Sequence, residues 1–159
     1  MMTHLQLSDY AIQIQRTMSK DQYAGFKEST LQVFGFLSEY GFEHTKTAVH
    51  NPECTVEFQN ETILLSLTHE MGGWLEILVA QLNEEGEHSP LYHLGKLIIR
   101  VKPRRKWYIE PFYIPLLRTR NSVRKNLEAY ADFLKNEGEG ILRGDFSICK
   151  PEDKLGRHM

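Results

Sequence analysis

The chain has few cysteines, little net charge and no long apolar run. Its two cysteines, Cys54 and Cys149, are too few and too far apart for a disulfide framework, which favours reduced thiols and a cytoplasmic location. A formal net charge of −2 gives no general attraction to nucleic acid or to an anionic membrane. The longest apolar stretches, residues 63–67 and 74–82, are interrupted by polar residues and too short to span a bilayer.

What remains is the composition of a globular protein. Hydrophobic residues make up 41% of the chain and charged residues 25%, which is far from the signature of disorder. A chain of 159 residues can bury roughly two-thirds of its unfolded surface. We therefore expect residues 1–159 to form a single domain.

A helix is expected from Lys20 to Tyr40, because apolar residues recur there at three-and-four spacing. Ser19 and Gln22 form a capping box at its start, and Gly41 can adopt the left-handed conformation after its last turn. Residues 1–18 fit either a helix or an alternating strand, and we favour the helix. The apolar stripe of the main helix consists of Tyr23, Phe26, Thr30, Val33, Phe34 and Leu37.

The middle of the chain alternates with a period of two, which predicts strands at 56–58, 63–67 and 78–82. Between the last two lies Gly72-Gly73, a pair suited to a tight hairpin turn. Pairing about that turn aligns the apolar faces of both strands. The predicted partners are Leu67 with Leu78, Leu65 with Ala80, and Ile63 with Leu82.

A second helix is expected from Asn121 to Asn136, with one apolar face. Gly138 and Gly140 end it, before a further short turn of helix. Each helix has a single apolar stripe and the hairpin offers a matching face. We therefore predict an α+β fold, in which both helices cover one face of an antiparallel sheet built around the Gly72-Gly73 hairpin.

Motifs for a metal, a cofactor or a nucleotide are missing. A helical zinc site needs two histidines four apart, whereas His88 and His93 are five apart across a proline. The carboxylates of residues 84–87 lack the spacing of a calcium loop, and no Walker or nucleophile-elbow motif occurs. The predicted register places His69 opposite Glu76, either as a structural charge pair at an exposed hairpin tip or as a general acid–base pair. We favour the structural pair, because no third group completes a site.

A basic and aromatic cluster lies within residues 91–117, where frequent prolines argue against a central strand or a long helix. Such a cluster can bind single-stranded nucleic acid, but the slightly acidic chain disfavours that partner. Because Arg, Trp and Tyr are enriched at interface hot spots, we predict that the cluster binds a partner protein. In the alternative, Trp107 and Tyr108 point into the core while the charges face water. The predicted partner-binding residues are Arg104, Arg105, Trp107 and Tyr108, and the charges before them are Arg100, Lys102 and Lys106.

Two stretches carry a family resemblance: Phe34-Gly35-Phe36-Leu37 with Tyr40-Gly41-Phe42, and Leu127-Glu128-Ala129-Tyr130-Ala131 leading to Leu142-Arg143-Gly144-Asp145. In this order of features the chain resembles small, mostly uncharacterised bacterial α+β proteins, some of them similar to polymorphic-toxin immunity proteins. The resemblance implies a bacterial cytoplasmic protein that binds another protein, and it assigns no functional residue. Two functions stay open: a protein-binding module of immunity or regulatory type, and a small hydrolase or transferase using His69 and Glu76.

Overall fold

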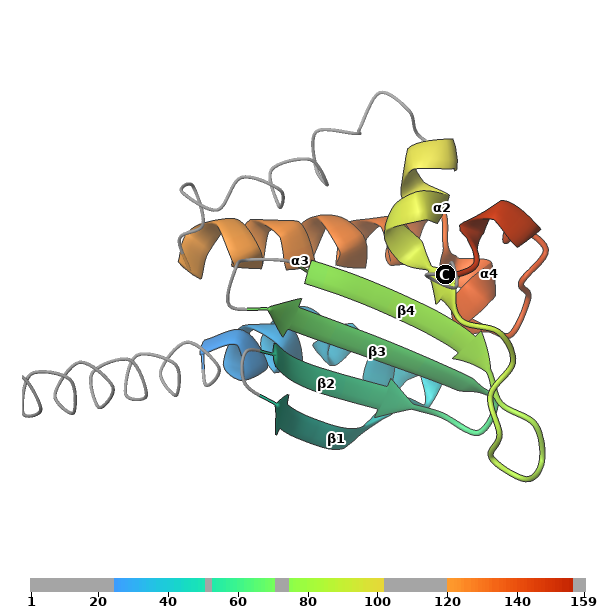
Figure 1. Cartoon of the computed structure of the whole chain (residues 1–159), viewed down its shortest axis with the longest axis horizontal. Coiled ribbons are helices and arrows are strands. Elements are labelled where there is room, and N and C mark those ends of the chain that lie inside the picture. Colours follow the sequence, from blue (N-terminus) through green and yellow to red (C-terminus); the bar gives the residue numbers. More distant parts are fainter. Residues whose placement is uncertain (1–24, 51–52, 71–74, 102–119, 156–159) are drawn as a thin grey trace, which may run out of the picture.

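The computed structural model describes residues 25–50, 53–70, 75–101 and 120–155 and shows the predicted α+β fold (Figure 1). Its centre is an antiparallel five-stranded sheet in which each strand pairs with the next along the chain. Among the described residues, no helix is long and apolar enough to cross a membrane. The strands are β1 (Glu43–His50), β2 (Glu53–Gln59), β3 (Ile63–Glu70), β4 (Leu75–Gln81) and β5 (Tyr92–His93).

Helices cover one face of this sheet. In Figure 1 the first helix and α3 lie behind the strands, and no described helix lies in front of β1, β2 and β3. The covered face is built from alternate residues of β2, β3 and β4, which are buried together with side chains such as Phe34 and Leu127 from the helices. The helical segments are residues 25–33, η1 (Gly35–Tyr40), α2 (Leu94–Val101), α3 (Arg120–Asn136), α4 (Glu139–Leu142) and η5 (Pro151–Asp153).

The first helix is confirmed within the described chain, and it ends more tightly than predicted. It is α-helical over residues 25–33 and then narrows into the 3₁₀ helix η1, where Gly35 has a low helix propensity. Gly41 adopts the predicted left-handed conformation with φ 79°. The Phe42 N–H then donates to the Leu37 carbonyl at 3.2 Å. The predicted capping box and residues 1–18 lie outside the described residues.

The predicted register of the β3–β4 hairpin is wrong by one residue. Leu67 pairs with Ile77 instead of Leu78, and Leu65 pairs with Val79 instead of Ala80. A slip of one residue exchanges the two faces of a strand, so Leu75, Ile77 and Val79 form the buried face of β4. The strand carries apolar residues on both faces, and alternation alone therefore cannot select between the two registers. Ile63 correspondingly pairs with Gln81, not with Leu82.

The helix α3 and the short helix α4 confirm the predictions for the C-terminal part. After α3, the N–H groups of Glu137 and Gly138 both donate to the Phe133 carbonyl at 2.8 Å. A Cβ at Gly138 would lie 3.2 Å from the Leu134 Cα, so a glycine fits this close approach. Strands β1 and β5 were not predicted, because β1 is mostly exposed and polar and β5 has only two residues.

Candidate functional site

The predicted partner-binding residues Arg104, Arg105, Trp107 and Tyr108 lie outside the described residues. Arg100, the one described member of the basic cluster, is engaged in a structural contact. Its Nη2 lies 2.7 Å from Oδ2 of Asp153, and its Nε lies 3.1 Å from Oδ1. The same guanidinium donates to the Ile148 carbonyl. Arg100 therefore belongs to the framework and not to a free basic surface.

Asp153 is the buried partner in this contact, with 1% of its surface exposed. Burial alone would raise the pKa of its carboxyl, but hydrogen bonds from Arg100 and from the Lys150 N–H outweigh burial and lower it. Lys96 adds a further tie, because its Nζ donates to the Lys154 carbonyl at 3.2 Å. These contacts fasten the C-terminal segment onto α2.

The predicted contact between His69 and Glu76 does not exist. In the observed register His69 pairs with Leu75, and Glu76 pairs with Thr68, so the two side chains lie on opposite faces of the sheet. The expectation that His69 sits exposed at a hairpin tip is also wrong. It is 1% exposed and stacks on Phe26, with ring centroids 5.1 Å apart. The two residues therefore cannot act together on one substrate.

Glu76 faces His93 instead, a residue whose role no motif in the sequence indicates. His93 directly precedes α2, and its Nδ1 accepts a hydrogen bond from the Lys96 N–H at 3.3 Å, which caps the helix. Burial first, and then the charge of Lys96, lowers the pKa of His93. The remaining ring nitrogen lies 3.8 Å from the Glu76 carboxylate, beyond hydrogen-bond length. Gly95 leaves room for the ring, because a Cβ there would lie 2.9 Å from its Cε1.

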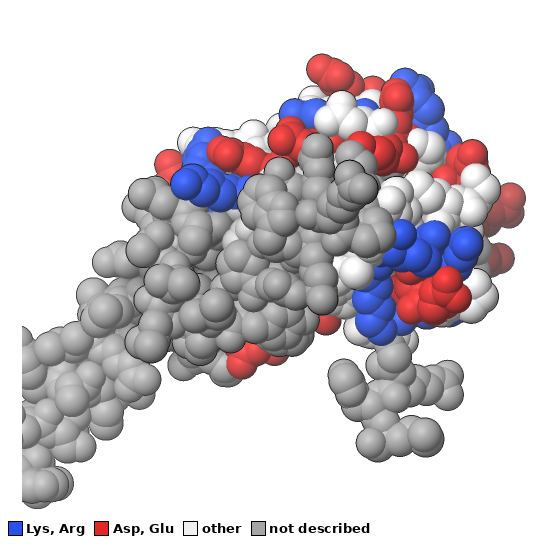
Figure 2. Space-filling model, turned by 90° about the horizontal axis from the view of Figure 1, so that it is seen from above, with Lys and Arg blue, Asp and Glu red and all other residues white. Residues whose placement is uncertain are grey.

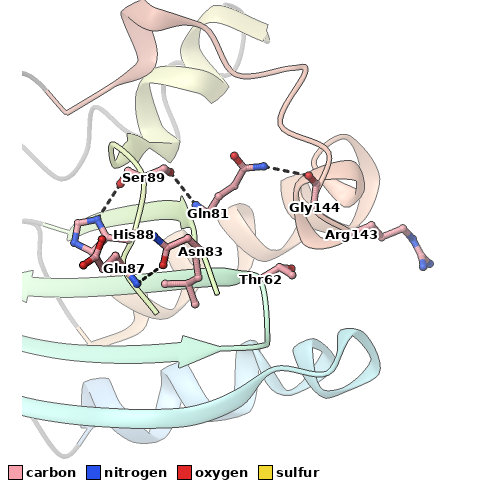
Figure 3. Close-up of a pocket in the computed structure, with 9 residues that line it drawn as sticks. Thr62, Gln81, Asn83, Glu87, His88, Ser89, Arg143 and Gly144 are labelled. Carbon is pink, nitrogen blue, oxygen red and sulfur yellow. Dashed lines mark hydrogen bonds between the residues drawn. The ribbon is translucent and has the colours of Figure 1, made fainter. Parts of the chain in front are cut away.

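A polar hollow of about 720 Å³ lies where the β4–β5 connection meets the turn after α4 (Figure 3). Its polar groups largely bond one another: the Gln81 amide donates to the Gly144 carbonyl at 3.3 Å, and the Asn83 side chain accepts from the Glu87 N–H at 2.8 Å. Arg143 points away from the other lining residues, and its Nη2 donates to Oε1 of Glu139 at 2.9 Å. The polar groups that line the hollow therefore hold the loops in place and offer few free groups to a ligand.

Metal and thiol chemistry find little support in the described part of the chain. No three His, Cys, Asp or Glu side chains gather there closely enough to hold a metal ion. Cys54 and Cys149 are both free thiols. Burial raises the pKa of Cys54, and burial together with the nearby Asp153 raises the pKa of Cys149 to about 11. Neither sulfur is thus an activated nucleophile.

The face of the sheet opposite the described helices, here called the open face, carries most of its acidic side chains near the edge strands and polar residues in its centre. Partners across antiparallel strands share a face, so the observed registers place Glu53 with Glu70, Glu57 with Ser66, and Glu76 with Thr68 on it. At its centre the hydroxyls of Thr55 and Thr68 lie 2.8 Å apart. The open-face carboxylates are those of Glu43, Glu53, Glu57, Glu70 and Glu76, and the basic side chains are Lys46, His50 and His93.

The open face differs in charge from the side that carries α2 and α3. On the described part of that side, seen in Figure 2, acidic and basic side chains lie next to one another. On the open face, carboxylates outnumber the lysine Lys46, which already lies opposite Glu57. Glu53 and Glu70 even stand directly opposite each other across β2 and β3. Like charges in that position destabilise a sheet.

Comparisons of this chain with protein-family models, curated proteins and solved structures give no significant match. The resemblance to immunity proteins therefore stays a prediction. The open face is the feature of the described chain from which a function can be inferred.

Proposed function

We propose that this chain is a protein-binding module of immunity or regulatory type, in a bacterial cytoplasm, which recognises a basic surface of its partner protein through the open face of its sheet. The observation that carries the proposal is the pairing of Glu53 with Glu70. Two carboxylates opposite each other repel and destabilise the free protein. A basic group on the partner would be attracted by both carboxylates and would relieve that repulsion.

The surroundings of this pair suit a protein partner. Between the carboxylates the face carries the short side chains of Thr55, Ser66 and Thr68 and the longer Leu78, all half-buried. This mixture of polar and apolar side chains spread over several strands suits contact with a protein surface. Carboxylates would also repel the phosphates of nucleic acid and of anionic lipid. Basic protein surfaces are the complementary class.

The test is capture of the partner from a lysate of the native cell by three forms of the protein. The first is wild type, and the second carries Glu53→Lys with Glu70→Lys on the open face. The third carries Glu84→Lys with Glu85→Lys in the exposed β4–β5 loop, which makes the same change in net charge away from the sheet. We expect wild type and the loop variant to capture the same protein, in amounts that fall with added salt.

The open-face variant should lose that protein, provided circular dichroism shows that it is folded. Equal capture by both charge-reversed variants would contradict the proposal, as would equal loss by both. The first result would place the binding surface elsewhere, and the second would indicate an effect of net charge alone.

A further inference from the structure

The chain protects the two edges of its sheet unequally. At the β5 edge the C-terminal segment adds a bridge between Tyr92 and Lys154, and the Leu155 N–H donates to the Leu91 carbonyl at 2.8 Å. At the other edge β1 pairs with β2, and Figure 1 shows no described element along its outer side. The outward N–H and C=O groups of β1 are therefore placed to pair with another strand.

An exposed apolar side chain marks the same edge. Val49 on β1 is 53% exposed, more than Leu155 at 37% or Ile99 at 36%. It pairs with Cys54, which is buried on the helix-covered face, so Val49 lies on that face at a point that the described helices leave exposed. A further strand beside β1 would cover this side chain.

We propose that β1 pairs in antiparallel fashion with β1 of a second copy of this chain, which joins the two sheets into one. A two-fold axis at Thr47 places each Thr47 opposite its counterpart. It also places Glu43 opposite His50 of the second copy, and His44 opposite Val49 of the second copy. The strand thus places the Glu43 carboxylate, a hydrogen-bond acceptor, opposite the His50 imidazole of the second copy at each end, and it covers Val49 near them.

The bulge in β1 makes this register possible. Glu43 pairs with Gln59 and His50 pairs with Glu53, so both side chains lie on the open face. They do so only because the register shifts by one residue at Thr45, between His44 and Lys46. Without that shift, Glu43 and His50 would lie on opposite faces of the sheet and could not face each other across the two-fold axis.

Two features of β1 that usually protect an edge strand do not block this pairing. A bulge and a lysine are the usual protections of an edge strand against indiscriminate pairing. Here Lys46 lies opposite Glu57 of its own sheet, so its charge is matched within the chain. The remaining stretch, residues 46–50, is regular and contains neither proline nor glycine. The dimer is independent of the proposed function, and it would present two open faces side by side.

Sedimentation velocity over a range from micromolar to millimolar protein tests the dimer. For wild type, the weight-average mass should rise with concentration from that of one chain toward that of two. Val49→Lys should keep the mass of one chain throughout, because an edge-strand lysine with no carboxylate opposite it in its own sheet opposes pairing with a further strand. Ile99→Lys is the matched control, since it makes the same change at an exposed apolar residue of α2 and should dimerise like wild type.

A charge exchange tests the register. Glu43→Lys alone removes the carboxylate opposite His50, and His50→Glu alone sets two carboxylates opposite each other. Each change occurs twice across the axis and should weaken the dimer about fivefold. The two changes together place opposite charges across the axis and should bring the affinity back to within about twofold of wild type. A wild type that remains one chain at every concentration would overturn the proposal. So would a dimer that tolerates Val49→Lys, or a double variant that is no better than the single ones.

Discussion

Arg100 at the end of α2 holds Asp153 in η5 through two side-chain nitrogens, with Nη2 2.7 Å from Oδ2. The contact fixes the segment that leads to Lys154 and Leu155, which cover the β5 edge of the sheet. A residue that the sequence placed in a basic binding cluster thus determines how the C-terminal part of the chain is held.

Asp153→Asn should lower the free energy of unfolding by about 2–3 kcal/mol, because it removes the charge of the buried carboxylate that pairs with the half-buried Arg100 guanidinium. Urea denaturation followed by circular dichroism measures the change. Glu152→Gln is the control, since Glu152 is exposed and lies 4.0 Å from Arg100. Its cost should stay below about 0.5 kcal/mol. Equal costs for both variants would show that Asp153 is not the principal partner of Arg100.

The same carboxyl should contribute to the pH dependence of stability. Its pKa is lowered in the folded protein, so its contribution is present above the pKa of the unfolded chain, about 3.9, and is lost as the pH falls through the folded pKa. The difference in unfolding free energy between wild type and Asp153→Asn should therefore be constant near neutral pH and shrink below about pH 4. Urea titrations at a series of pH values measure it. A difference that does not shrink in acid would contradict the assignment.

Gly95→Ala should destabilise the protein by about 1–2 kcal/mol, although alanine is usually the better helix former. The added methyl group would lie 2.9 Å from the ring of His93 and 3.2 Å from the hydroxyl of Tyr130, so the His93 cap of α2 must move. Gly140→Ala in α4 is the matched control, because its nearest neighbour would lie at an ordinary 3.5 Å. Thermal melts compare the two variants. A stabilising Gly95→Ala would mean that His93 does not need its observed position.

The sequence was sufficient where local chemistry decides the structure. Apolar spacing predicted both long helices, and Gly41 predicted the left-handed end of η1. It was insufficient where packing decides. The apolar residues of β4 fit two registers, and only burial against the helices selects the one in which Ile77 faces the core. The polar edge strand β1 has no apolar alternation, so its pairing with β2 becomes visible only in the fold.

The candidate site depended on that register. With the predicted pairing, His69 and Glu76 face each other. With the observed pairing, His69 enters the core and Glu76 joins the open face. The pairing of Glu53 with Glu70 likewise requires the β2–β3 register, which alternation suggests but does not fix. Charge positions on a sheet are therefore the least predictable part of such a site.

The proposed function requires that the Glu53–Glu70 pair destabilises the free protein and attracts a basic partner. Glu70→Lys tests it in a single variant, because it replaces repulsion from Glu53 with attraction. We predict that the free protein becomes more stable by about 0.2–1 kcal/mol in urea denaturation, while capture of the partner from the native lysate is lost. Glu84→Lys, the same change in the exposed loop, should alter neither. A Glu70→Lys protein that gains stability and still captures the partner as wild type does would contradict the account.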